Sequence, residues 1–167
     1  QGGVARGLVP RSGSRVADLL RFFFKQKTAY EIGEERATLE MDHAAAVEFV
    51  RECCLSAGFG IPVEFSPSEL LNEKVDADRD PYHVLGACNP EMADRALDGS
   101  DRTMGGLFPC NVVVWEREPG VQQVYHVSIM RIARLVGMAP DDEEWANLVA
   151  DTGDIVDELF EQIRRGP

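Results

Sequence analysis

The chain has 167 residues, of which 44% are hydrophobic, and this is enough for one domain whose core needs no disulfide or metal ion. Its formal net charge of −12 argues against nucleic acid and anionic membranes as partners, because binding to phosphate depends on clustered Lys and Arg side chains. No apolar run is long enough to cross a bilayer, and four cysteines without a C-x-x-C motif predict a reducing, cytoplasmic compartment.

The first 35 residues differ from the rest. They carry six basic and four acidic side chains, so the remainder carries 11 basic and 25 acidic ones and a net charge of −14. Residues 25–32 resemble the translation of a sequencing adapter, which would make residues 1–33 an artefact fused to a truncated gene. We therefore interpret residues 1–35 as a non-native or disordered extension and residues 36–167 as a single domain. The alternative is an amphipathic or signal-like arm that carries Arg21 and three Phe side chains.

The domain begins with a predicted strand followed by a predicted helix. Residues 36–42 alternate apolar and polar side chains, as a half-buried strand does. Asp42 can then cap a helix over residues 44–57, where apolar side chains recur every three or four positions. Cys53 and Cys54 belong to that apolar set. Because adjacent helical positions point about 100° apart, we interpret them as core residues rather than metal ligands.

A second strand and a second, shorter helix follow. The strand covers residues 59–65, and Pro62 places it at a sheet edge or a bulge because proline cannot donate to a ladder. Ser66 is the predicted cap of the helix, with Glu69 as its partner in a capping box. The acidic run at residues 76–81 is predicted to be a solvated turn, because it lacks the glycine and the glutamate that a calcium loop requires.

The middle of the domain predicts three further strands. One covers residues 82–88 and leads into a short helix over residues 90–97, which Asn89 can cap. After a loop at residues 99–106, two strands within residues 111–127 form a hairpin around a Glu-Pro-Gly turn.

Two helices complete the pattern. The first is short and covers residues 130–136; the second begins at Pro140 and carries an apolar stripe as far as Ile163, interrupted only by Gly153. We expect the stripe to cover the sheet, with homodimer formation as a second use. The order of elements predicts an α+β fold with a single mixed sheet of about five strands, packed by helices and ending in a long amphipathic helix.

Two segments of this sequence resemble a known family. Residues 82–90 read Tyr-His-Val-Leu-Gly-Ala-Cys-Asn-Pro, and residues 107–116 read Leu-Phe-Pro-Cys-Asn-Val-Val-Val-Trp-Glu. Together they closely resemble the bacterial and archaeal domain of unknown function 302 family, from residue 36 to the C-terminus. The resemblance implies a small α+β domain with a curved sheet packed by helices, and a biochemical role that is not established. One departure is Ser-Ile-Met-Arg at residues 128–131, where family members often carry Asp-Pro.

The two Cys-Asn pairs are the candidate functional residues. If their strands are neighbours, Cys88 and Cys110 approach each other at one rim of the sheet. Thiolates bind soft metal ions and asparagine amides can orient a small polar ligand, although two thiols alone make a weak metal site. The alternative is that both cysteines are buried small residues and both asparagines satisfy turn backbone. The remaining candidates for ligand binding are Asn89, Asn111, Glu116 and His83.

The sequence thus predicts an acidic, soluble bacterial domain of uncharacterised role. The favoured function is a non-enzymatic accessory module, a homodimer that binds a small ligand or metal ion at the Cys-Asn turns. The alternative is a thiol-dependent redox protein or enzyme that uses Cys110 and/or Cys88, with His83 or His126 as the base for Cys110. The motifs do not indicate a cofactor, because the sequence contains no phosphate loop, H-E-x-x-H or G-x-S-x-G.

Overall fold

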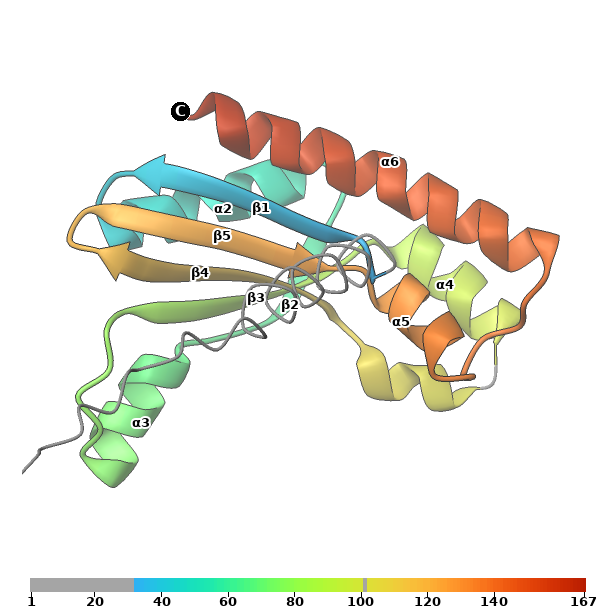
Figure 1. The fold of residues 1–167 in the computed structure, drawn as a ribbon, viewed down its shortest axis with the longest axis horizontal. Coiled ribbons are helices and arrows are strands. Elements are labelled where there is room, and N and C mark those ends of the chain that lie inside the picture. Colours follow the sequence, from blue (N-terminus) through green and yellow to red (C-terminus); the bar gives the residue numbers. More distant parts are fainter. Residues whose placement is uncertain (1–31, 101) are drawn as a thin grey trace, which may run out of the picture. The chain divides into compact units, whose positions relative to one another are not determined.

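A five-stranded sheet organises the part of the chain that the computed structural model describes, residues 32–100 and 102–167 (Figure 1). The strands lie in the spatial order β1-β5-β4-β3-β2. The predicted N-terminal extension lies outside the described residues except for its last four, and β1 already begins at Glu34. The strands are β1 (Glu34–Glu40), β2 (Gly60–Phe65), β3 (Tyr82–Cys88), β4 (Cys110–Glu118) and β5 (Val121–Val127).

Helices connect and cover these strands, which confirms the α+β class. The loop that the sequence predicted over residues 99–106 contains the short 3-10 helix η1 (Arg102–Leu107). The helices are α2 (His43–Ser56), α3 (Pro67–Val75), α4 (Pro90–Gly99), α5 (Ile129–Leu135) and α6 (Glu143–Arg165). In Figure 1, α4, α5 and η1 gather at one end of the sheet, and α3 projects at the other.

All four strand pairings are antiparallel. The sequence had predicted a mixed sheet, and this part of the prediction is wrong. Strands β1 and β2 do run in the same direction, as a strand-helix-strand unit suggests. However, α2 carries the chain across the full width of the sheet, and the three other strands lie between them. Strands of like direction therefore never become neighbours.

Helices α2 and α6 pack against one face of the sheet and against each other. Strand alternation places Leu85, Val114 and Val124 on this face, where all three are fully buried. Cys53 and Cys54 of α2 lie in the same core, as the sequence predicted. The opposite face, called the open face below, carries aromatic side chains at β3, β4 and β5.

Helix α6 joins this core to a second one. Its first half packs with α4, α5 and η1 through Trp145, whose Nε1 donates to the Met130 carbonyl at 3.2 Å. Its second half reaches the sheet through residues such as Phe160, which is fully buried. The predicted apolar stripe of α6 is therefore confirmed, and the two cores of the domain bury it.

Side-chain caps begin the helices. Asp42, Ser66 and Asn89 accept hydrogen bonds from the backbone of α2, α3 and α4, as predicted. Ser128 caps α5, which locates the start of this helix in the segment that departs from the family pattern. Asp142 caps α6, so this helix begins three residues after the predicted Pro140.

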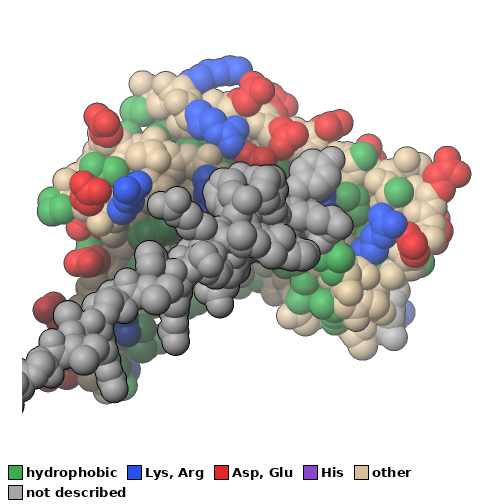
Figure 2. Space-filling model, in the orientation of Figure 1, with side chains coloured by type: hydrophobic (Ala, Val, Ile, Leu, Met, Phe, Trp, Pro, Cys, Tyr) green, Lys and Arg blue, Asp and Glu red, His purple; other side chains and the backbone are tan. Residues whose placement is uncertain are grey.

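Acidic side chains follow the outer surface of α6, and its two basic side chains, Arg164 and Arg165, stand at its C-terminal end (Figure 2). One ion pair there joins Arg164 to Glu35 of β1, and another joins Arg165 to Glu161 at 2.9 Å. Within the described residues, the helices are too short or too polar to cross a membrane.

Candidate functional site

Strand pairing brings the two Cys-Asn segments together. Ala87 pairs with Cys110 and Gly86 with Asn111, so Cys88 at the end of β3 lies diagonally across from Cys110 at the start of β4. Both cysteines line one small cavity beside Met92 of α4 and Met130 of α5. Strands β3 and β4 are therefore neighbours, which is the condition under which we expected the two thiols at one rim of the sheet.

The cavity between the thiols is small and apolar. Its volume is about 10 Å³, which corresponds to room for about one water molecule. Burial, with a smaller contribution from the nearby Cys88, raises the pKa of Cys110 to about 12. Cys110 is therefore a protonated thiol at neutral pH, which is a poor nucleophile and a poor metal ligand.

The two asparagines do not bind each other; each forms hydrogen bonds with other parts of the chain. The Asn89 side chain accepts from the Met92 N–H at 3.1 Å and donates to the Gly58 carbonyl at 3.3 Å. Asn111 has an exposed side chain, and its carbonyl accepts from Nδ1 of His126 at 3.1 Å. Burial lowers the pKa of His126 despite this hydrogen bond, so the ring is neutral.

His83 lies on the helix-covered face, away from the thiols. Its Nε2 is 2.7 Å from Oε1 of Glu64 on β2, and Arg51 of α2 pairs with the same carboxylate. Burial raises the pKa of Glu64, but the hydrogen bonds from His83 and Arg51 outweigh it, and the net pKa is lowered. Glu64 is therefore an anion bound between two partners.

Glu116, at the far end of β4 from Cys110, belongs to a polar group that adjoins His83. Gln122 is fully buried, and its Nε2 donates to the Glu116 carboxylate at 3.3 Å. Its Oε1 is 2.8 Å from Nδ1 of His43, whose ring centroid lies 6.4 Å from that of His83. Sequence reasoning missed His43 and Gln122. Gln122 shares its strand face with Val124 and His126, so no apolar pattern marked it as buried.

Metal binding finds no support in these groups. Across the described residues, no cluster of three or more His, Cys, Asp or Glu side chains is placed to hold a metal ion. The four described cysteines are free thiols, two of them buried in α2.

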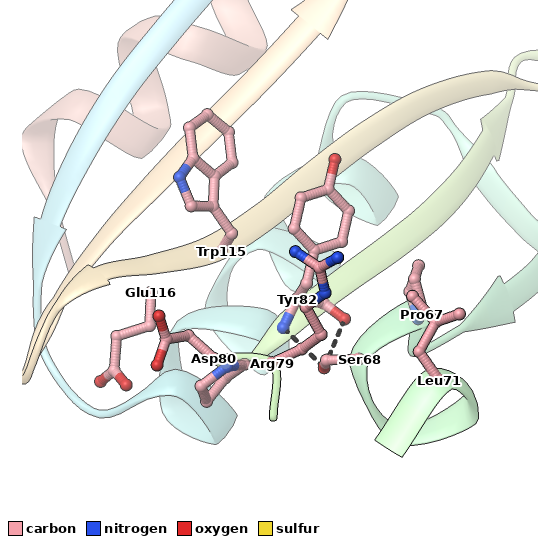
Figure 3. Close-up of a pocket in the computed structure, with 9 residues that line it drawn as sticks. Pro67, Ser68, Leu71, Arg79, Asp80, Tyr82, Trp115 and Glu116 are labelled. Atoms are coloured by element: carbon pink, nitrogen blue, oxygen red, sulfur yellow. Dashed lines mark hydrogen bonds between the residues drawn. The ribbon is translucent and has the colours of Figure 1, made fainter. Parts of the chain in front are cut away.

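A larger pocket lies between α3 and the start of β3, where β3 meets β4. This pocket, called the α3 cleft, has a volume of about 390 Å³. The rings of Tyr82 and Trp115 stack beside it, with centroids 6.2 Å apart and planes inclined by 23°. Its lining comprises Pro67, Ser68, Leu71, Arg79, Asp80, Pro81, Tyr82, Trp115 and Glu116 (Figure 3).

Hydrogen bonds fix the walls of the α3 cleft. The buried Ser68 hydroxyl accepts from the Tyr82 N–H at 2.9 Å and lies 3.3 Å from the Tyr82 carbonyl, which ties α3 to β3. Asn72 binds the backbone of Arg79 twice, with its amide oxygen 2.9 Å from the Arg79 nitrogen. The turn at residues 76–81 is thus held against α3 by a side chain that mimics a backbone partner.

Charged groups of both signs border the α3 cleft. In Figure 3, Asp80 and Glu116 lie on one side of Arg79, with Pro67 and Leu71 on the other. Within the described residues, neither Arg79 nor Asp80 takes part in an ion pair. Of the candidate residues from the sequence, only Glu116 lines this pocket.

Comparison with known families identifies the family of this chain. The model of the domain of unknown function DUF302 matches residues 35–163. The chain belongs to the DUF302 family. A crystal structure of an uncharacterized conserved DUF302 protein from Bacillus stearothermophilus has the same fold, with a TM-score of 0.66 and 22% sequence identity. The similarity covers 77% of this chain and 96% of that one. A search of curated proteins finds no match.

Membership in DUF302 confirms the resemblance that the two Cys-Asn segments carry. Both segments lie within the matched residues. The family description assigns no reaction or ligand, so the function has to be argued from this chain's own geometry.

Proposed function

We propose that this DUF302 domain is a non-enzymatic module that binds a small molecule in the α3 cleft. The observation that carries the proposal is a pocket of about 390 Å³ lined by a stacked Tyr82–Trp115 pair and a few polar groups. Small-molecule sites typically have volumes of about 300–1,000 Å³, mostly apolar walls and a small number of polar groups that orient the ligand.

The lining suggests the chemistry of the ligand. The faces and edges of Tyr82 and Trp115 suit a flat ring, because aromatic pairs prefer offset or tilted stacking. Arg79 and Asp80 offer one cationic and one anionic group to substituents on that ring. A planar molecule with polar substituents at its edge therefore fits the cleft better than a purely aliphatic one.

Binding is a better proposal than catalysis at this place. The hydroxyl of Ser68, the one serine in the lining, is hydrogen-bonded to the Tyr82 backbone, and no histidine lines the cleft beside it. The Cys-Asn turns remain a predicted ligand site, but their cavity of about 10 Å³ admits no more than a water molecule. The thiol-dependent alternative is also disfavoured, because the raised pKa of Cys110 keeps it protonated.

The experiment is a ligand-observed NMR screen with three aromatic probes: indole-3-acetate, adenosine and tyramine. They present an anionic, a neutral and a cationic substituent on a flat ring. We expect saturation transfer to at least one probe. Binding of none of the three at millimolar concentration would contradict the proposal.

A matched pair of variants localises the binding. Leu71→Phe places a larger side chain in the α3 cleft and should abolish the saturation transfer. Leu70→Phe makes the same change at the preceding helical position, which is 51% exposed and does not line the cleft, so it should leave binding intact. Equal effects of both variants would place the ligand elsewhere.

A further inference from the structure

Exposed apolar side chains concentrate on β2, α3 and the first residue of β3. In the described part of the chain, ten large hydrophobic side chains are exposed, and six of them lie on these three consecutive elements. We call these six the β2–α3 surface. Its members are Val63, Phe65, Leu70, Leu71, Val75 and Tyr82.

The register and the helical spacing show that this surface is continuous. Val63 pairs with Gly86 and Phe65 with Val84, which puts both side chains on the open face together with Tyr82. Leu71 and Tyr82 line the same cleft, and Val75 lies one helical turn beyond Leu71. The apolar surface therefore runs from the sheet edge onto the helix without a gap.

The helices and strands that the structure describes leave this surface exposed. Helices α2 and α6 pack on the opposite face of the sheet, and the apolar side chains of α6 are buried in the two cores. Strand β2 is the last in the sheet, so its outer backbone groups have no strand partner among the described residues. The other edge strand, β1, is protected by its charged side chains, whereas β2 carries only Glu64.

We propose that a second copy of this chain docks on the β2–α3 surface. From the exposed fractions, the six residues present roughly 500 Å² of surface, most of it apolar, which lies toward the upper end of the range for the largest patch on a monomer. A specific interface buries about 800 Å² on each partner, with an apolar centre and a polar rim, so a patch of this size matches the apolar centre of such an interface.

The geometry of the edge also suits a two-fold partner. Every pairing in this sheet is antiparallel, and a two-fold axis at β2 places the partner's β2 antiparallel to it. The bulge between Gly60 and Val63, where Pro62 lacks a donor, shortens the part of β2 that can pair. Association therefore depends on burial of the apolar side chains more than on a backbone ladder.

The rim of the surface makes the association depend on salt. On α3 and the turn after it, two basic side chains, Lys74 and Arg79, are outnumbered by five acidic ones, so two copies bring like charges together. The five are Glu69, Glu73, Asp76, Asp78 and Asp80. Added salt screens this repulsion and should strengthen dimerisation. A basic protein partner on the same surface would show the opposite dependence.

The test is sedimentation equilibrium of the full chain from about 1 to 100 µM, at low and at high salt. Leu70→Glu and Val75→Glu put a charge on the β2–α3 surface without touching the lining of the cleft. The matched controls are Leu135→Glu and Val136→Glu, which are 57% and 61% exposed and lie at the end of α5. Circular dichroism checks that each variant is folded.

We expect a dimer in the wild type, stronger at high salt, and a dissociation constant at least tenfold higher for Leu70→Glu and Val75→Glu. Leu135→Glu and Val136→Glu should leave it unchanged. A wild type that stays monomeric to 100 µM overturns the proposal, even if it captures a basic partner. Equal weakening by both pairs of variants overturns it as well.

Discussion

Gly86 stands where the two Cys-Asn segments meet, and replacing it by alanine tests whether packing alone explains a glycine there. A β-carbon at this position would lie 2.6 Å from Cγ of Pro109 and 2.9 Å from the carbonyl oxygen of Val63. Non-bonded carbon atoms normally stay about 3.5–4.0 Å apart. Val63 is the ladder partner of Gly86, so its carbonyl cannot retreat without disturbing the pairing of β2 with β3.

The expected magnitude follows from two opposing effects. Overpacking a core position typically costs about 1–3 kcal/mol, and a clash with backbone belongs at the upper end of that range. Alanine regains about 0.5–1 kcal/mol relative to glycine within a strand. Gly86→Ala should therefore lower the free energy of unfolding by about 2 kcal/mol.

Urea unfolding followed by circular dichroism measures this change. With a slope of about 2 kcal/mol/M, a loss of about 2 kcal/mol moves the midpoint down by about 1 M at an unchanged slope. The matched control is Gly153→Ala in α6, where a β-carbon meets no atom within 4 Å. Alanine there should stabilise the helix by up to about 1 kcal/mol. If both variants gain stability, the packing argument for Gly86 is refuted.

Three further predictions concern the same region. Asn89→Ala should lower the free energy of unfolding by about 1 kcal/mol, because α4 loses its cap. Asn89→Asp can still cap the helix and should retain most of the wild-type stability. Urea unfolding measures both variants, and equal losses of stability would refute the role of Asn89 as a cap. Because burial lowers the pKa of His126, the unfolded state binds more protons below about pH 6.5, so stability should rise with pH through this range. His126→Gln should flatten that part of the profile, and an unchanged slope between pH 5 and 8 would contradict the assignment. Because the pKa of Cys110 is raised to about 12, iodoacetamide at pH 8 should label it, by peptide mass mapping, more slowly in the native chain than in urea; equal rates would count against a buried, protonated thiol.

The candidate site shows where sequence reasoning succeeds. Asn89 follows an apolar strand and precedes Pro90, and this local pattern was sufficient to assign it as a helix cap. The approach of Cys88 to Cys110 was expected only if their strands are neighbours, and the pairing of β3 with β4 meets this condition. These predictions depend on residues close together in the chain or on adjacent strands.

The same reasoning missed the α3 cleft. Ser68, Arg79 and Trp115 come from a helix, a turn and a distant strand, and nothing in their spacing links them. The sequence signal for this cleft was weak. Tyr82 is the first residue of one predicted strand and Trp115 lies near the end of another, and these strands carry few other aromatic side chains. His83 and Glu116 were named for proximity to the thiols, but the register places them in the polar group around Glu64 and Gln122.

By itself, the sequence determined the strands and the five α-helices, three of their caps and the family, because periodicity, capping residues and the Cys-Asn segments are local features. Only the tertiary structure decided that the strands pair antiparallel throughout, since this depends on α2 crossing the whole sheet. The tertiary structure also decided which apolar helix face stays exposed to solvent. The stripe of α6 is buried in two cores, whereas the apolar side chains of α3 are exposed beside β2, which has no outer neighbour among the described strands. An amphipathic pattern shows that a face needs a partner, but only the fold shows whether the chain supplies that partner itself.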